Sequence, residues 1–285
     1  MERPSFDPDL LKARTREQWD QAAEGWYDKR DEIRAWLREP TQAMLDLAGI
    51  TPGASVLDVA AGAGDQTLDI AERVGSAGTV LATDISPSIL QFARENARRA
   101  GYRNIDVHLA DGERLGVPSI FDAAICRLGL MFYPNPLAGL REIFDALKPG
   151  GRACTLVFSE AIRNPCIMTT MATALKHAGR THSDPDTPGG LFSLAKPGVI
   201  ESLFERTGFS QVRTITLPAP MKLPSVEHYI DFIRSSAGPI RDIIAPLDAP
   251  ARQAAWDEMT RRLACFETPE GWEGPNELLL TAGTR

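Results

Sequence analysis

The sequence predicts an α/β fold built on a seven-stranded, mostly parallel sheet with an antiparallel edge strand, N-terminal helices and a helical cap insertion. Short apolar runs alternate with segments of helical periodicity over residues 55–158, which is typical of a parallel sheet with helices on both faces. Two later runs, at 211–217 and 278–282, can pair antiparallel at the sheet edge. A small-residue turn, residues 60–64, follows the first apolar run and marks the edge where a ligand can approach the backbone.

The strands and helices can be placed in order along the chain. Helical patterns over residues 9–30 and 41–48 lead into the sheet, and the strands of the first part are expected at residues 55–60, 79–83, 105–109, 121–126 and 153–158. Ser86 and Pro87 begin a helix that Gly101 ends. A second helix, over residues 137–147, ends at the Pro149-Gly150-Gly151 turn.

After residue 160 the pattern becomes helical and then enters a loop rich in His, Asp, Pro and Gly. A helix over 199–206 precedes the last two strands, which a further helical excursion separates. We therefore expect four parts: an N-terminal helical lid (1–50), a cofactor-binding core (51–160), a cap insertion (161–195), and a C-terminal part that completes the sheet (196–285).

Composition narrows the classes of partner. The chain of 285 residues has a formal net charge of -7, which disfavours nucleic acid or an anionic membrane as the main partner. Its four cysteines are scattered, so we expect no metal site and no disulfide framework. With no apolar leader and no apolar run of membrane-spanning length, a cytoplasmic enzyme with a small-molecule substrate is expected, and a homodimer stays open.

A strand, a small-residue turn and a helix, followed by a second strand that ends at Asp84, predict a site for an adenosine-containing cofactor. The register of the first turn indicates which of these cofactors binds. In a Rossmann dinucleotide site a third glycine would stand where this chain has Thr67. The alternative register begins with Asp58 and continues through Ala60, Gly62 and Gly64. A carboxylate at the end of the first strand can bind a cationic amino group, which a pyrophosphate lacks.

These residues resemble the first motif of class I S-adenosylmethionine-dependent methyltransferases, D/E-x-G-x-G-x-G, with Ala60 in place of the first glycine. Asp84 matches the family's ribose-binding acid, Ala110-Asp111-Gly112 its adenine segment, and residues 147–151 its turn before the fifth strand. Residues 121–132, FDAAICRLGLMF, resemble the ubiquinone and menaquinone biosynthesis (methyltransferase type 11) group.

The resemblance implies S-adenosylmethionine as cofactor and a small, aromatic or quinone/isoprenoid-like acceptor. The residues that it places at the cofactor are Tyr27, Asp58, Ala60, Gly62, Gly64, Asp84, Ile85, Ala110, Asp111, Gly112, Arg127 and Leu128. Trp19 and Trp26 share a helical face with Tyr27, but we expect them in the core. Candidate acceptor contacts are Arg127, Met131, Met168, Met171 and Phe192.

Methyl transfer needs little acid-base chemistry, because the cofactor carries the electrophile. If a general base assists, the candidates are His177, His182 and His228, since His108 falls inside a strand. Three alternatives differ in class: an NAD-type dehydrogenase, a nucleic-acid or protein methyltransferase, and a non-catalytic S-adenosylmethionine-binding partner protein. Arsenic methylation is disfavoured because it would need clustered thiolates.

Overall fold

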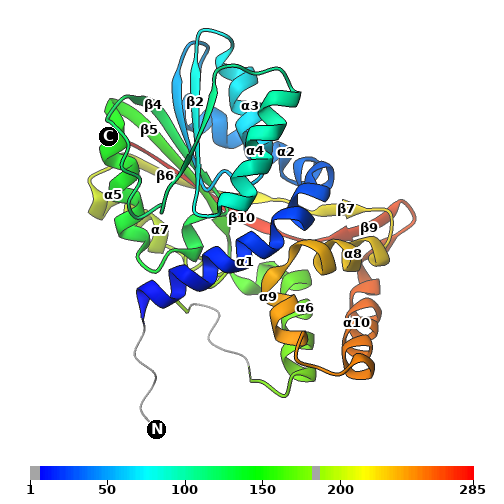
Figure 1. Ribbon diagram of the computed structural model, residues 1–285. Coiled ribbons are helices and arrows are strands. Elements are labelled where there is room, and N and C mark those ends of the chain that lie inside the picture. The colour runs from blue at the N-terminus through cyan, green and yellow to red at the C-terminus, as the bar shows by residue number, and fades with distance from the viewer. Residues whose placement is uncertain (1–6, 182–186) are drawn as a thin grey trace.

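A computed structural model describes residues 7–181 and 187–285 and contains the predicted sheet (Figure 1). Seven strands lie in the order β3-β2-β1-β4-β5-β10-β6. Their bounds are β1 Ser55–Val59, β2 Thr79–Asp84, β3 Ile105–Leu109, β4 Phe121–Arg127, β5 Leu147–Phe158, β6 Ser210–Pro218 and β10 Glu277–Thr284. Strands β1 to β5 pair in parallel, and β10 is antiparallel to both β5 and β6. The antiparallel strand therefore lies one place in from the edge that β6 forms.

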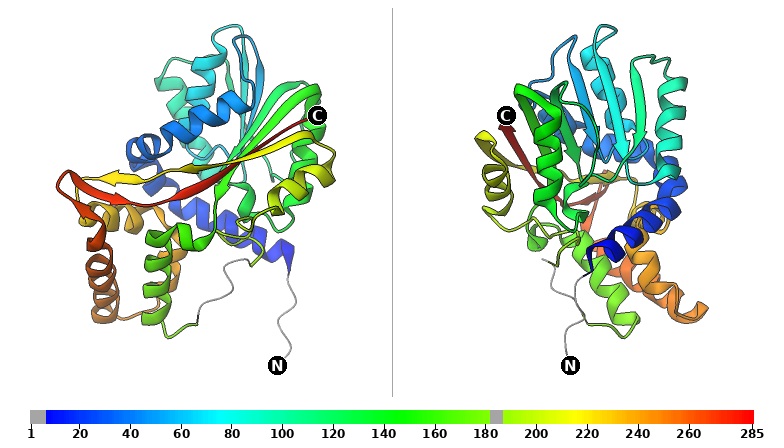
Figure 2. Two further views of the ribbon diagram at one scale, coloured as in Figure 1. Left: turned by 180° about the vertical axis from the view of Figure 1, so that it is seen from behind. Right: turned by 60° about the vertical axis from the view of Figure 1, so that its left-hand side comes forward.

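Helices cover the sheet on both faces, as the alternating pattern predicts. Helix α2 packs on α3, and α3 on α4, while α5 and α7 pack together. The two groups lie on opposite sides of the strands (Figures 1 and 2). Their bounds are α2 Arg30–Leu47, α3 Asp65–Val74, α4 Pro87–Arg99, α5 Pro136–Ala146 and α7 Val199–Thr207. The sequence predicts this helix from residue 41, but α2 begins eleven residues earlier, at Arg30. Pro40 lies inside the helix and does not break it.

A second group of helices lies beyond the carboxyl ends of the parallel strands (Figure 2). It combines the insertion with the later excursion, because α6 contacts both α9 and α10, and α8 contacts α10. The bounds are α6 Pro165–His177, α8 Val226–Ser236, α9 Gly238–Ile244 and α10 Ala249–Leu263. A small antiparallel sheet in the order β7-β9-β8 adjoins them, with β7 Met221–Leu223, β8 Glu267–Thr268 and β9 Gly271–Gly274. The sequence predicts neither this sheet nor the joining of the two segments.

Helix α1 (Pro8–Asp28) lies between the sheet layer and these helices and contacts α4, α8 and α9. Its crossing with α8 is tight, because a Cβ atom built on Gly25 would lie 1.9 Å from the carbonyl oxygen of Ser235. Lys29, at the end of α1, also pairs with Asp231 of α8 at 2.5 Å. Only glycine at position 25 allows the two helix backbones to approach this closely.

Candidate cofactor and active site

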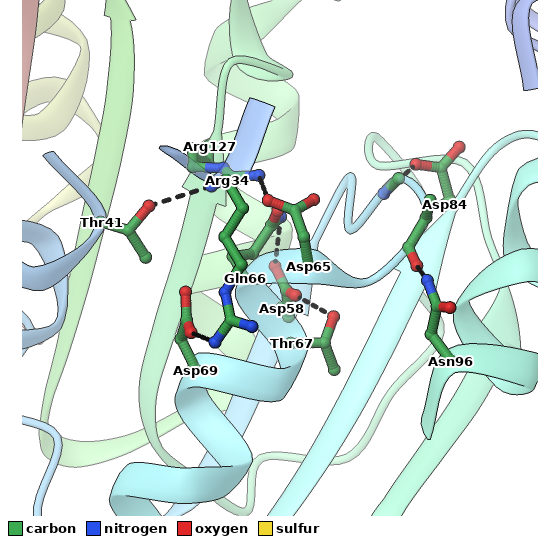
Figure 3. A network of polar contacts seen from close by, with 12 residues as sticks. Arg34, Thr41, Asp58, Asp65, Gln66, Thr67, Asp69, Asp84, Asn96 and Arg127 are labelled. Carbon is green, nitrogen blue, oxygen red and sulfur yellow. Dashed lines mark hydrogen bonds and ion pairs between the residues drawn. The ribbon is translucent and has the colours of Figure 1, made fainter. Parts of the chain in front are cut away.

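The glycine turn after β1 adopts the conformation that its sequence requires. Gly62 and Gly64 have φ values of 58° and 85°, in the left-handed region that favours glycine. A Cβ atom on Gly64 would lie 3.0 Å from the Cβ of Ala93 on α4. The turn is further fixed by Asn96, whose amide donates to the carbonyl of Ala63 at 2.9 Å (Figure 3). Both glycines are thus needed to bring β1, α3 and α4 together.

Ala60, where the family pattern has glycine, adopts the left-handed conformation with a φ of 55°. Its methyl group takes the space that a side chain on Gly129 would need, because a Cβ on Gly129 would lie 2.4 Å from the Cβ of Ala60. The alanine at position 60 is therefore accommodated by a glycine at position 129, just after β4.

This pairing predicts a rescue between two substitutions. Gly129→Ala should lower the free energy of unfolding by about 1 to 3 kcal/mol, because the new methyl group overpacks against Ala60. Ala60→Gly in the same chain should restore most of that loss, since it removes the opposing methyl group and the left-handed alanine. Denaturant unfolding of the wild type, both single variants and the double variant measures the coupling. Additive effects would contradict the pairing.

Asp84, at the carboxyl end of β2, is buried and linked to the glycine turn. One carboxylate oxygen accepts the backbone N–H of Gly62 at 3.0 Å, and the other accepts that of Ser86 at 3.0 Å. Burial raises the pKa of Asp84 to about 6, although these hydrogen bonds from backbone N–H groups oppose the shift. Asp84 thus joins the glycine turn after β1, the first turn of the site, to the second turn, which follows β2.

Asp58, at the same edge on β1, is fully buried beneath the start of α3. The hydroxyl of Thr67 donates to it at 2.6 Å and the amide of Gln66 at 3.1 Å (Figure 3). Burial raises the pKa of Asp58 to about 7, against these two hydrogen bonds and the charge of Arg127. Thr67, which stands where a dinucleotide site has its third glycine, is therefore used to orient this carboxylate.

Arg127, the last residue of β4, lies in a buried ion pair. Its guanidinium donates to the hydroxyl of Thr41 at 2.9 Å and pairs with the carboxylate of Asp65 at the start of α3 (Figure 3). Arg127 is only 6% exposed. The side chain expected to touch cofactor or acceptor is thus directed at α2 and α3, where it joins three elements around the glycine turn.

The third turn, after β3, carries the predicted adenine segment and faces helix α1. Lys12 of α1 pairs with Asp111 at 2.7 Å and with Glu113 at 2.8 Å. A cavity of about 260 Å³ lies here, lined by Lys12, Ala13, Arg16, Ile85, Leu109, Ala110 and Asp111. Whole ligand pockets usually measure about 300 to 1,000 Å³, so this cavity suits one part of a cofactor. Three of the predicted cofactor residues, Ile85, Ala110 and Asp111, line it together.

Gly112, the remaining residue of that segment, leaves room for an aromatic side chain. A Cβ atom on Gly112 would lie 1.8 Å from the hydroxyl oxygen of Tyr133, and one on Gly139 of α5 would lie 2.6 Å from the same ring. Gly112 therefore seats Tyr133 between the third turn and α5.

A larger hollow of about 490 Å³ lies on the outer side of α4, against β3. It is lined by Pro87, Leu90, Gln91, Arg94, Glu95, Arg98, Val107 and Leu109. None of the predicted cofactor or acceptor residues contributes to it. The smaller cavity, which adjoins the turns, is therefore the better candidate for the cofactor.

Tyr27 and Leu128 lie at the margins of the turns. The Tyr27 ring stacks on Phe92 of α4 with centroids 4.4 Å apart, and its hydroxyl accepts from Arg99 at 2.6 Å. Leu128, just after β4, has a φ of 56° and donates its N–H to the carbonyl of Leu156 at 2.8 Å. A non-glycine residue in this conformation is a source of local strain, which is common at functional sites.

Apart from Arg127, the predicted acceptor residues are apolar and partly or fully buried. Met131 lies in a short 3-10 helix, Leu130–Phe132, directly after β4. Met168 and Met171 are half-buried on α6, and Phe192 is buried with its ring edge-to-face with Phe158 at 6.1 Å. These side chains belong to one continuous apolar cluster with the sheet core.

The two candidate bases in the described part of the chain do not gather at the turns. His177, at the end of α6, shares a hydrogen bond of 2.8 Å with Glu258 of α10. His228, on α8, shares one of 3.1 Å with the hydroxyl of Ser225. His182 lies outside the described residues. Within residues 7–181 and 187–285 no cluster of His, Cys, Asp and Glu could hold a metal ion, and no helix is long and apolar enough to cross a membrane.

The sequence does not predict what α1 contributes to the site. Lys12 and Asp20 reach the second and third turns, although both are far from those turns in the sequence. The hydroxyl of Ser86 donates to Asp20 at 2.5 Å, next to Asp84. In the sequence, Lys12 and Asp20 look like ordinary charged residues on an exposed helix face, so nothing indicates that they contact these turns.

Comparison with known proteins agrees with this geometry. The family model described as "ubiE/COQ5 methyltransferase family" matches residues 31–176. The ubiquinone/menaquinone biosynthesis C-methyltransferase UbiE of Pasteurella multocida is 36% identical over 149 residues, which cover 50% of this chain and 54% of that protein. Its namesake from Hydrogenovibrio crunogenus is 37% identical over 129 residues, covering 45% and 49%. The chain thus matches about half of the length of these relatives.

Two solved structures show the same fold at low sequence identity. Phosphoethanolamine N-methyltransferase 2 of Haemonchus contortus, in complex with S-adenosyl-L-methionine, has a TM-score of 0.54 at 15% identity, covering 87% of this chain and 52% of that one. The [4+2]-cyclase SpnF has a TM-score of 0.54 at 18% identity, covering 93% and 95%. Because one is named a methyltransferase and the other a cyclase, the fold alone does not fix the reaction.

The family model covers just over half of the chain, from α2 through α6, and this stretch contains all three turns and the buried residues that join them. The chain therefore belongs to the ubiE/COQ5 methyltransferase family, and its cofactor is S-adenosylmethionine.

Proposed function

We propose that the protein transfers a methyl group from S-adenosylmethionine to a small, apolar, aromatic or quinone/isoprenoid-like acceptor. The observation that carries the proposal is the meeting of three turns at one sheet edge, where Asp84 accepts from Gly62 and Ser86 and where Asp111 borders a cavity. The relatives named C-methyltransferases of ubiquinone and menaquinone biosynthesis support the acceptor class.

In this proposal each turn of the chain holds one part of the cofactor. The cavity at Asp111 suits the adenine, and Asp84 is positioned to accept hydrogen bonds from the ribose hydroxyls. The buried carboxylate of Asp58 contributes negative potential below the glycine turn, which favours the ammonium group. The remaining predicted cofactor residues shape the backbone around these groups.

When bound, the cofactor supplies an electrophilic methyl group on a sulfonium centre, so the chain mainly has to align the acceptor and exclude water. Met131 and Phe192, from the apolar cluster beyond β4, are our candidates for contacting a planar acceptor. An aromatic carbon beside a phenolate is nucleophilic enough to attack in line, and the ring proton then leaves to solvent or to a base. A role in that proton transfer remains our proposal for His177, His182 or His228.

A methylation assay tests the acceptor class. Purified protein, with methyl-labelled S-adenosylmethionine, would be offered short-chain hydroxylated benzoquinols and naphthoquinols, simple phenols and primary amines, under reducing conditions. We expect label in a carbon-methylated quinol, identified by mass spectrometry. Label in the amines alone, or binding of cofactor without any product across the panel, would overturn the proposal in favour of another acceptor or a non-catalytic role.

Cofactor binding should weaken on acidification, because Asp84 and Asp58 titrate with pKa values of about 6 and about 7. Ribose hydroxyls and the ammonium group prefer the ionised carboxylates, so the Kd for S-adenosylhomocysteine should rise as the pH falls from 8 to 5. Below about pH 6 the rise should approach ten-fold per pH unit for each carboxylate involved. Titration calorimetry across this range measures it, and a flat profile would contradict the assignment.

The same groups give stability the opposite pH dependence. Because burial raises both pKa values above the usual 3.8, the folded protein holds these protons more tightly than the unfolded chain between about pH 4 and 7. Their contribution to stability is present below pH 4 and is lost as the pH rises through 6 and 7. Because the cofactor is expected to bind more tightly at pH 8, thermal unfolding should show it raising Tm more at pH 8 than at pH 5.

A further inference from the structure

Helix α1 passes over all three turns of the site and contributes one side chain to each. Near its start, Lys12 pairs with Asp111 at the third turn. In its middle, Asp20 accepts from Ser86 at the second turn. Trp26, near its end, reaches the glycine turn.

The nitrogen of the Trp26 indole lies directly against that turn. A Cβ atom built on Gly62 would be 3.6 Å from this nitrogen. Trp19 holds the ring in place, edge-to-face, with centroids 5.4 Å apart. A methyl group at position 62 would touch the indole nitrogen at ordinary van der Waals distance, and glycine leaves that space free.

That N–H has no hydrogen-bond acceptor among the described residues, unlike those of two other tryptophans. Trp36 donates to the carbonyl of Ala219 at 2.8 Å, and Trp272 to that of Leu263 at 2.9 Å. An indole N–H can only donate, and because Trp26 is half-buried, this one is left to solvent or to a ligand. Trp26 is thus an available donor at a turn whose glycine leaves room for a ligand.

A ligand with a carboxylate at this turn would find few other donors. The buried guanidinium of Arg127 is already used by Asp65 and Thr41, and Lys12 is used by Asp111 and Glu113. Arg16 lines the cavity with Ile85 and Asp111, at the second and third turns. The cofactor's amino-acid part ends in a carboxylate, which needs a donor at the glycine turn, where the Trp26 N–H lies.

We propose that Trp26 binds the carboxylate of the cofactor's amino-acid part through its indole N–H, so that α1 forms part of the cofactor site. The proposal rests on S-adenosylmethionine being the cofactor. It assigns a recognition role to a residue that its helical spacing alone would place in the core.

The test compares Trp26→Phe with the matched variant Trp19→Phe on the same helix. Each is titrated by calorimetry with S-adenosylhomocysteine and with 5′-methylthioadenosine, which keeps the purine and ribose but has no carboxylate. Trp26→Phe should lose roughly ten- to a hundred-fold in affinity for S-adenosylhomocysteine, the loss expected for one hydrogen bond to a charged group. Its affinity for 5′-methylthioadenosine should change by less than about two-fold, and Trp19→Phe should lose equally for both ligands.

Binding of 5′-methylthioadenosine shows that each variant is folded. An equal loss for both ligands in Trp26→Phe would mean that the ring only packs, and would overturn the proposal, as would an unchanged affinity for S-adenosylhomocysteine. Failure of the wild type to bind either ligand would instead overturn the cofactor assignment itself, so the two failures are distinguishable.

Discussion

Asp84→Asn protein should bind S-adenosylhomocysteine roughly a hundred-fold or more weakly than the wild type. Two ribose hydroxyls would lose hydrogen bonds to a charged acceptor, each worth about 1.5 to 3 kcal/mol. Asparagine keeps the shape and one acceptor oxygen, so the N–H groups of Gly62 and Ser86 would compete for it. Titration calorimetry gives the Kd, and circular dichroism shows whether the sheet is intact.

Asp106→Asn is the matched control. Asp106 is an exposed carboxylate on β3, outside the three turns, so its removal should leave the Kd within about two-fold of the wild type. If Asp84→Asn bound as well as this control, the ribose assignment would be wrong. If Asp84→Asn bound weakly only because it had unfolded, circular dichroism and thermal unfolding would reveal it.

Arg127→Met should lower the free energy of unfolding by about 3 to 5 kcal/mol. The substitution removes one partner of a buried ion pair and leaves the Asp65 carboxylate buried without its cation. It also removes the hydrogen bond to Thr41, which joins α2 to the same network. Denaturant unfolding monitored by circular dichroism measures the loss.

Arg34 offers a nearby comparison, because its side chain is 47% exposed while it pairs with Asp69 on α3. Arg34→Met should lower the free energy of unfolding by only about 1 kcal/mol, as expected for a solvent-screened pair. Adding Asp65→Asn to Arg127→Met should recover part of the loss, because the unpaired charge is removed. If Arg127→Met protein were stable and bound the cofactor but did not methylate the acceptor, direct contact between Arg127 and the acceptor would be indicated instead.

The parts of the site that the sequence predicts are those set by local geometry. The glycine turn, Asp84 at the end of β2 and the Ala110-Asp111 segment are each fixed by residues a few positions away, so their order along the chain is informative. The seven strands are predictable for the same reason, because alternating apolar and helical segments determine a parallel sheet.

The remainder depends on contacts that no local pattern encodes. Lys12 and Asp111 are 99 residues apart, and Arg127 and Asp65 are 62 residues apart. The strands β7 and β8, of three and two residues, have too few positions for a strand pattern. A lone histidine such as His177 gives no sign of whether its neighbour is a substrate or, as here, Glu258 on an adjacent helix.

The tight crossing at Gly25 links α1, which faces the three turns, to the outer helices. Because α1 and α8 touch through their backbones, a displacement of α8 by a bound acceptor would also move α1, and with it the side chains that α1 directs at the three turns. Cofactor and acceptor would then alter the affinity of one another by the same factor, as thermodynamic reciprocity demands. A bulkier residue at position 25 would separate the two helices and should abolish this cooperativity between donor and acceptor.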